Sequence, residues 1–222
     1  MTQTKQQVKT LIFVGEKQSG KTSLINRFLD QQIKEDVAET TALEFKSGLK
    51  LNNDKKVKTN VYELGGGRNF ANLLEAALSG GNLASTTVCI VLDLTKPGNV
   101  IDSVLFWLKS VREQAQVALD ALAQSNPEQH AQVNQAVREP WQSHEDRDRI
   151  NLPPVPIAIM GAKFDAYANQ YETAVKKQLC MALRFLAHSN GCDLVFASVR
   201  EKLPSQLYRS LLMAHLFEMP SQ

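Results

Sequence analysis

Cysteine, histidine and long apolar runs are all scarce in this chain, and each scarcity excludes a class of protein. Its three cysteines are odd in number and lie in apolar or helical surroundings, which is typical of reduced intracellular thiols and not of a disulfide framework. Its four histidines are scattered without the spacing of a zinc site. No stretch approaches the ~18 apolar residues that span a bilayer, and the start of the chain is polar. We therefore expect neither secretion nor a transmembrane segment.

The chain also lacks an excess of charge of either sign. The 25 basic and 23 acidic residues leave a formal net charge of +2, and no run of like charge stands out. Nucleic acid and anionic membranes are therefore not expected as the main partners. The 222 residues suffice for one α/β domain with its own core and are too few for two ordinary domains. We expect a single domain over residues 1–222.

The sequence does contain one complete phosphate-loop motif, G-x-x-x-x-G-K-[ST], between an apolar run at 10–14 and a helix-like segment at 23–29. In that context backbone N–H groups and the helix N-terminus face a polyphosphate, and Lys21 adds a full positive charge. Thr22 would place its hydroxyl on a Mg²⁺ ion that bridges the outer phosphates. The predicted nucleotide-binding residues of this segment are Gly15, Glu16, Lys17, Gln18, Ser19, Gly20, Lys21, Thr22 and Ser23.

Apolar strand-like and amphipathic helix-like segments alternate along the chain. Strands are expected at 10–14, 42–51, 57–64, 86–94, 155–160 and 194–197, and helices at 23–29, around 70–78, from Pro97 onward, at 172–188 and at 204–216. The second and third strands flank a turn-rich cluster and form a plausible hairpin. This order predicts an α/β fold with a mostly parallel central sheet, helices on both faces and one antiparallel edge. The core spans about 8–216, and the polar segment at about 125–152 is predicted to be an insertion outside it, with a short helix of its own.

Ligands of such open sheets lie at the carboxyl ends of the strands, so residues there are the first candidates for a site. After the third strand, Glu63 could hold a metal-bound water and the Gly66 N–H could meet a terminal phosphate, although a plain turn would look similar. Thr40 could reach Mg²⁺ or a γ-phosphate, although threonines near a strand start are also simple β-formers. The predicted metal-binding residues are Thr22, Thr40 and Glu63.

Two further strand ends could recognise the base. Asp165 can accept hydrogen bonds from the N1–H and exocyclic amine of guanine while the Lys163 stem lies along the ring, which would select guanine over adenine. The alternative for Asp165 is a plain helix N-cap. Ser198 and Val199 could offer a backbone N–H to the guanine oxygen.

In order and approximate spacing these strand ends resemble the Ras-like G domain, a P-loop NTPase fold, over about Val8 to Leu216. The departures are informative. Gly67 stands where many G domains carry a water-positioning Gln, and Ala162 stands in place of the Asn of Asn-Lys-x-Asp, which braces the phosphate loop. No arginine is evidently placed to act in cis. The resemblance therefore implies GTP hydrolysis at or below the scale of about 10⁻⁴ s⁻¹ of an unassisted G domain.

Four strings resemble, more narrowly, the light intermediate chains of cytoplasmic dynein, and most of all the branch that serves retrograde intraflagellar transport. They are Tyr62-Glu63-Leu64-Gly65-Gly66-Gly67, Val91-Leu92-Asp93-Leu94-Thr95-Lys96-Pro97, Pro154-Val155-Pro156 leading to Gly161-Ala162-Lys163-Phe164-Asp165, and Leu183-Arg184-Phe185-Leu186-Ala187-His188. The glycine string is much more specific than a phosphate loop, and the strings occur in the order of the family. Members usually continue into a C-terminal extension beyond the position of Gln222, and functions housed there are not expected of this sequence.

That resemblance implies a noncatalytic motor subunit that binds the dynein heavy-chain tail and other dynein subunits, with no nucleic acid or direct membrane partner. The implied location is the cytoplasm, the cytoskeleton, and the cilium or flagellum with its basal body. The implied cofactors are GTP or GDP and Mg²⁺, bound with structural effect and little turnover.

Two other interpretations remain open, a small switch GTPase and a phosphate-loop enzyme that acts on ATP. Lys163 and Asp165 favour guanine over ATP, and the missing Gln and Asn favour the motor subunit over the switch. For the docking surface the candidates are Trp107, which lies near the core stripe and is expected to be buried, and Trp141, which is expected to be exposed in the insertion and to contribute to the heavy-chain contact.

Overall fold

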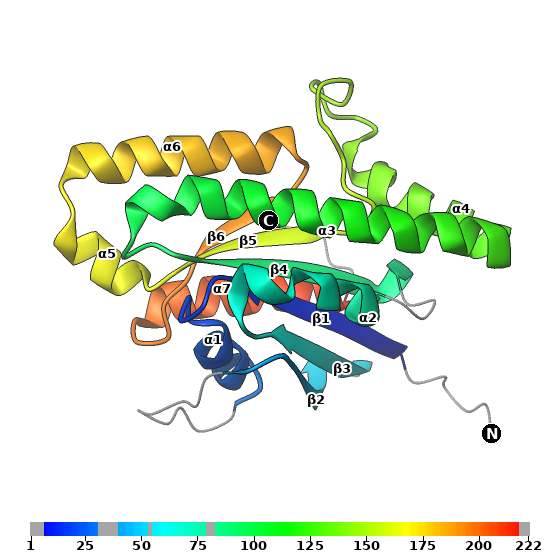
Figure 1. Ribbon diagram of the computed structural model, residues 1–222, viewed down its shortest axis with the longest axis horizontal. Coiled ribbons are helices and arrows are strands. Elements are labelled where there is room, and N and C mark those ends of the chain that lie inside the picture. The colour runs from blue at the N-terminus through cyan, green and yellow to red at the C-terminus, as the bar shows by residue number, and fades with distance from the viewer. Residues whose placement is uncertain (1–6, 31–39, 53–54, 79–82, 218–222) are drawn as a thin grey trace.

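The computed structural model describes residues 7–30, 40–52, 55–78 and 83–217, and is built on a six-stranded sheet in the order β2-β3-β1-β4-β5-β6 (Figure 1). The strands are β1 (Gln7–Gly15), β2 (Leu43–Asn52), β3 (Lys55–Leu64), β4 (Thr86–Asp93), β5 (Ile157–Ala162) and β6 (Asp193–Phe196). Only the β2–β3 pair is antiparallel among these neighbours. The mixed α/β class, the mostly parallel sheet and the hairpin are thus confirmed. The predicted hairpin-turn residues 53–54 and the predicted loop at 31–39 lie outside the described residues.

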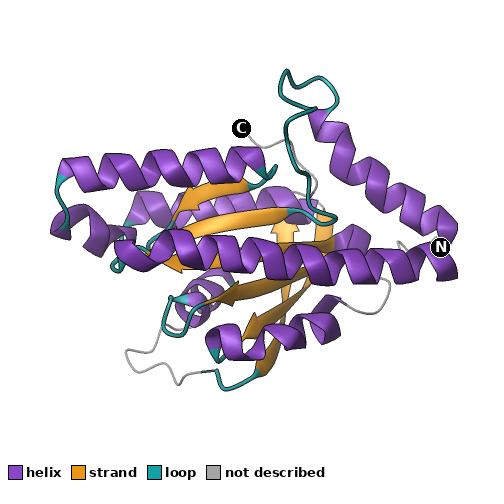
Figure 2. Cartoon of the chain, turned by 45° about the horizontal axis from the view of Figure 1, so that its top comes forward, coloured by secondary structure: helices purple, strands orange, loops and turns teal. Residues whose placement is uncertain are grey.

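Helices cover both faces of the sheet, as Figure 2 shows together with the long α3 that runs across it. The helices are α1 (Lys21–Phe28), α2 (Leu74–Leu78), α3 (Pro97–Ser125), α4 (Pro127–Arg138), α5 (Phe164–Gln170), α6 (Thr173–Ser189) and α7 (Lys202–Phe217), with short 3-10 helices η1 (Gly67–Leu73), η2 (Leu83–Ser85) and η3 (Glu139–Trp141). One layer of core residues joins the sheet to α2, α3 and α6, and a second layer joins its other face to α1 and α7. Within the described residues no helix combines the length and apolar composition needed to cross a membrane.

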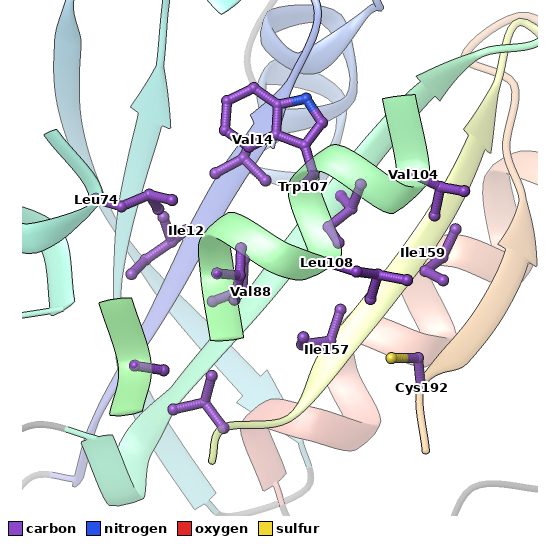
Figure 3. Close-up of a cluster of buried hydrophobic side chains, with 14 of the residues drawn as sticks. Ile12, Val14, Leu74, Val88, Val104, Trp107, Leu108, Ile157, Ile159 and Cys192 are labelled. Carbon is purple, nitrogen blue, oxygen red and sulfur yellow. The ribbon is translucent and has the colours of Figure 1, made fainter. Parts of the chain in front are cut away.

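Trp107 lies at the centre of the first layer. Its side chain projects from α3, is fully buried, and packs with Val14 of β1 and other apolar residues of the sheet (Figure 3). Because β4 is covered on both faces, its residues alternate between the two layers and all but the last are buried. The expectation that Trp107 is packed inside is confirmed.

The segment at 125–152 has its own helix, α4, whose N-cap Asn126 accepts a hydrogen bond from the Gln129 backbone N–H. Val133 of α4 is buried in the same layer as Trp107, so the segment is not wholly outside the core. The expectation of an exposed Trp141 is wrong. This ring is half-buried, and its centroid lies 5.1 Å from that of His144 and 6.2 Å from that of His188 on α6.

Two other local expectations need correction. The helical stripe predicted from Phe70 is a 3-10 helix until Leu73, and Phe70 itself has non-helical dihedral angles and is exposed. A short helix, α5, directly follows β5 and was not expected. Both departures lie at the carboxyl ends of strands, where the chain must turn within a few residues.

Candidate functional site

The phosphate-loop motif forms a tight turn between β1 and α1. Gly15 has φ 148°, and a Cβ placed on it would lie 2.2 Å from the Val91 carbonyl oxygen of the neighbouring strand. Gly20, directly before α1, has φ 101°. Both conformations favour glycine, because they allow the backbone to turn closely around one point. Ser23 follows in the first turn of α1 and is half-buried.

Lys21 lies inside this turn. Its side chain is buried, and Nζ donates to the carbonyl oxygens of Gly15 at 3.1 Å and Glu16 at 2.8 Å. Ser19 is also fully buried, and its Oγ has no hydrogen-bond partner in the described part of the chain. The positive charge of the buried Lys21 ammonium and the Ser19 hydroxyl suit an anionic ligand that accepts hydrogen bonds.

The structure joins two of the three predicted metal-binding residues. The Thr22 hydroxyl donates to Glu63 Oε1 at 2.5 Å, whereas Glu63 Oε2 is buried without a partner among the described residues. Burial raises the pKa of the Glu63 carboxyl, although the Thr22 hydrogen bond and the Lys21 ammonium act to lower it. The Thr40 hydroxyl donates instead to Glu44 Oε2 at 3.1 Å.

Replacing Glu63 with glutamine tests this buried carboxylate. A raised pKa means that the folded state binds more protons than the unfolded state between the ordinary and the raised value, so wild-type stability falls as pH rises through that window. We expect Glu63→Gln to melt about 2–4 °C higher than wild type at neutral pH without ligand. The difference should shrink toward pH 4.

Differential scanning fluorimetry across pH measures this difference. An equal difference at pH 4 and pH 7.5 would contradict the assignment to ionisation. The conservative Glu63→Asp variant is the control, since it keeps the charge and should not melt higher than wild type.

Three consecutive glycines after β3 are each required by a different close approach. A Cβ on Gly65 would lie 1.9 Å from the Thr40 carbonyl oxygen, and one on Gly66 would lie 1.9 Å from the Phe70 ring. Gly66 and Gly67 both have positive φ, at 71° and 64°. A Cβ on Gly67 would lie 3.3 Å from both Glu16 Oε2 and the Lys17 backbone nitrogen. The segment therefore packs directly against the phosphate loop.

Arg68 fixes this segment to its surroundings. Its Nε donates to Glu16 Oε1 at 2.5 Å, and its Nη2 donates to Asp102 Oδ2 of α3 at 2.5 Å. The guanidinium also lies 4.7 Å from the centroid of the Phe106 ring. No arginine was expected to act in cis, and the structure pairs Arg68 of η1 with Glu16 of the phosphate loop.

The predicted base-recognition residues follow the ends of β5 and β6. Asp165 Oδ1 accepts a hydrogen bond from the Ser198 hydroxyl at 2.8 Å, and Ser198 Oγ accepts from the N–H groups of Arg200 and Glu201. Lys163, with φ 57°, places Nζ 2.7 Å from Asp93 Oδ2.

Asp165 and Ser198 are thus brought together, and Val199 packs against the second core layer. A Cβ on Gly20 would lie 3.6 Å from Ala162 Cβ, so the missing Asn side chain leaves only a methyl group next to the loop.

Residues 2–197 match the family described as dynein light intermediate chain. The chain belongs to the dynein light intermediate chain family. It is 32% identical over 206 residues to cytoplasmic dynein 2 light intermediate chain 1 of Danio rerio. This match covers 92% of this chain and 56% of the relative. The human counterpart is 31% identical over 201 residues, with 88% and 56% covered.

Human cytoplasmic dynein 1 light intermediate chain 1 is more distant, at 25% identity over 252 residues, with 96% of this chain and 46% of the relative covered. This light intermediate chain therefore resembles the dynein 2 type more than the dynein 1 type. It spans about half the length of the curated relatives it matches.

Two residues that were not predicted to belong to the site hold predicted site residues in place. Arg68 holds Glu16 of the loop, and Asp93 holds Lys163. Asp93 lies within one of the strings that carry the family resemblance, so that string was a usable signal. Arg68 follows the glycine string directly, but its partner is 52 residues away in sequence, which no local pattern indicates.

Proposed function

We propose that this chain acts as a noncatalytic light intermediate chain of a cytoplasmic dynein, which binds and stabilises the heavy-chain tail in retrograde intraflagellar transport and cilium assembly. Membership of the family and greater similarity to dynein 2 than to dynein 1 relatives support this proposal. The proposed location is the cytoplasm and cytoskeleton, including the cilium or flagellum and its basal body. The proposed fold is that of a Ras-like G domain, supported by the strand order and the phosphate loop between β1 and α1.

The same domain is proposed to hold GDP or GTP as a structural ligand. One observation carries this proposal: Lys21 is buried in the phosphate loop, and the adjacent Thr22 is hydrogen-bonded to Glu63 of β3. In the same loop the buried Ser19 hydroxyl has no hydrogen-bond partner among the described residues. Lys21 would neutralise phosphate charge, and Thr22 with Glu63 would hold Mg²⁺, which shields the outer phosphates. Asp165, kept in place by Ser198, would select guanine.

Little turnover is expected of that nucleotide. Gly67 has no side chain to position a water molecule, and its backbone packs against the loop at Lys17. Arg68 is engaged by Glu16 and Asp102. A phosphate site in which Gly67 provides no side chain to orient the attacking water suits a scaffold better than a switch.

The experiment is to purify the protein, denature it and identify the released nucleotide by chromatography, together with thermal shifts on addition of GDP, GTP and ATP with Mg²⁺. We expect released guanine nucleotide, or stabilisation by GDP and GTP but not by ATP. No released nucleotide and no thermal shift would refute the nucleotide proposal. GTP hydrolysis far above the scale of about 10⁻⁴ s⁻¹ without a partner would instead favour the switch GTPase.

Restoring the missing glutamine should not create an active GTPase. Gly67→Gln places a side chain at positive φ and against the loop, so we expect a lower melting temperature and no gain in GTP hydrolysis. Gly98→Gln is a matched control, because a Cβ there meets nothing within 4 Å. Malachite-green phosphate release and thermal melts measure both effects. A Gly67→Gln protein that melts like wild type and hydrolyses GTP faster would contradict this account.

A further inference from the structure

The edge strand β2 has an inverted polarity. Its lysines, Lys46 and Lys50, face the α1 side of the sheet, with Lys50 buried. Its apolar residues Phe45, Leu49 and Leu51 face the opposite side, where they are 52%, 52% and 56% exposed. An ordinary half-buried strand shows the reverse pattern.

The contacts of Lys50, which is buried, and Lys46, which is partly buried, show that this register is fixed. Lys50 Nζ donates to the Phe28 carbonyl oxygen, pairs with Asp30 Oδ2 at 2.9 Å, and lies 4.6 Å from the centroid of the Phe28 ring. Lys46 Nζ donates to Asn26 Oδ1 at 3.0 Å. A slip by one residue would break these contacts and exchange the two faces. The exposed apolar face is therefore specified by the fold.

The exposed face continues across the sheet. Leu49 pairs with Lys58 of β3, which in turn pairs with Val8 of β1, and Val8 is 40% exposed. Phe45 pairs with Tyr62 and their ring centroids lie 5.1 Å apart. We define Val8, Phe45, Leu49 and Leu51 as the hairpin patch; the exposed Lys56 and Lys58 lie within it, opposite Leu51 and Leu49.

The hairpin patch belongs to the sheet face that α2, α3 and α6 cover elsewhere. Tyr62, which pairs with Phe45, packs against that core layer. The hairpin lies at the edge of the sheet, at the lower side of Figure 1. An α/β sheet is stable when helices cover both of its faces, so a helix is the element that would complete this layer.

The lysines of the hairpin further restrict which kind of partner can bind the patch. Inward-pointing lysines on an edge strand disfavour addition of another strand, so binding on the face is favoured over extension of the sheet. A helix that binds across the hairpin patch would contact the apolar side chains at the centre of the patch and the two lysines beside them. A complementary helix therefore has an apolar stripe flanked by Asp or Glu.

We propose that the hairpin patch is a docking surface for an acidic amphipathic helix of the dynein heavy-chain tail. This inference rests on the proposed function, since it names the face that the proposed partner covers. The apolar anchors supply the affinity, and Lys56 and Lys58 orient the helix.

The test measures binding of the full 222-residue chain to a recombinant dynein 2 heavy-chain tail by biolayer interferometry. We expect Phe45→Asp combined with Leu49→Asp to weaken binding by at least about 30-fold, since anchor residues typically contribute more than 1 kcal/mol each. Lys56→Glu with Lys58→Glu should weaken binding by about 3- to 10-fold and reduce its salt dependence. The matched control is Met181→Asp with Phe185→Asp on α6, which are 61% and 71% exposed and should leave binding unchanged.

Each other outcome is decisive. Wild-type affinity of the Phe45, Leu49 variant, with an unchanged melting temperature, overturns the inference while leaving the proposed function intact. A wild-type chain that does not bind the tail refutes the proposed function itself. If the Phe45, Leu49 variant keeps tail binding but loses binding to phosphatidylserine vesicles, the inference is overturned in favour of a membrane. If it keeps tail binding but changes a dimer of this chain into monomers, the inference is overturned in favour of a second copy.

Discussion

Replacing Lys21 with methionine should lower the affinity for guanine nucleotide by about 100-fold. Methionine keeps much of the apolar stem but removes the ammonium that Gly15 and Glu16 hold inside the loop. Hydrogen bonds to charged groups contribute about 1.5–3 kcal/mol each, and every 1.4 kcal/mol is tenfold in affinity. Titration with a fluorescent GDP analogue, below the melting temperature of the variant, measures the loss.

Lys17→Met is the matched control for this prediction. Lys17 belongs to the same loop, where its predicted contact with the nucleotide is through the backbone N–H, which the substitution keeps. Its side chain is exposed, so its replacement should change GDP affinity by less than about threefold. Equal losses in the two variants would show that net charge attracts the nucleotide and that the buried cradle does not. Unchanged affinity in Lys21→Met would contradict the assignment of the phosphate site.

Trp107→Ala should lower the free energy of unfolding by about 3–5 kcal/mol, the usual cost of truncating a buried aromatic residue. Trp107 is fully buried in the layer between α3 and the sheet, and its removal leaves a large cavity beside Val14 (Figure 3). The melting temperature should fall by roughly 10 °C or more. Urea unfolding followed by circular dichroism gives the difference directly.

Two companion variants separate volume from chemistry. Trp107→Phe should cost much less, because it keeps an aromatic ring and removes an indole N–H that has no hydrogen-bond partner in the described structure. Leu105→Ala, on the exposed side of the same helix, should be within about 0.5 kcal/mol of wild type. A Trp107→Ala protein as stable as Leu105→Ala would contradict the packing described above.

The sheet could be predicted from the sequence because its signals are local. Apolar runs such as 86–94 are typical of strands covered on both faces, and the turn-rich cluster after Leu51 indicates a hairpin. The phosphate loop could be predicted because one short motif contains both glycines and Lys21. In each case neighbours in sequence determine the structure.

The expectations that failed depend on distant partners. Trp141 is half-buried because it packs against His188, which lies on another helix. Phe70 leaves the predicted stripe because its ring must lie over Gly66, and Arg68 is directed by Glu16 and Asp102. The exposed face of β2 was also unpredictable, since the strand pattern does not say which face α1 covers.

The glycine string Gly65-Gly66-Gly67 combines a signal that is local in the sequence with contacts to distant segments. Its resemblance to a family was readable, but the reason for each glycine is a contact with a different segment: Thr40, Phe70 and the phosphate loop. Through those contacts the segment after β3 packs against the phosphate loop, and Gly67 is the residue that lies next to Glu16 and Lys17. The string that resembles the family thus also contains Gly67, which has no side chain where many G domains carry a water-positioning Gln.

Co-elution with the heavy-chain tail tests the central claim most directly. The purified chain, loaded with GDP and Mg²⁺, is mixed with a recombinant dynein 2 heavy-chain tail and analysed by size-exclusion chromatography with light scattering. The account predicts one stable complex, with the same yield after incubation with GTP as with GDP. Separate elution of the two proteins in both nucleotides would contradict it, and a complex formed in GTP but lost in GDP would identify a switch in place of a scaffold.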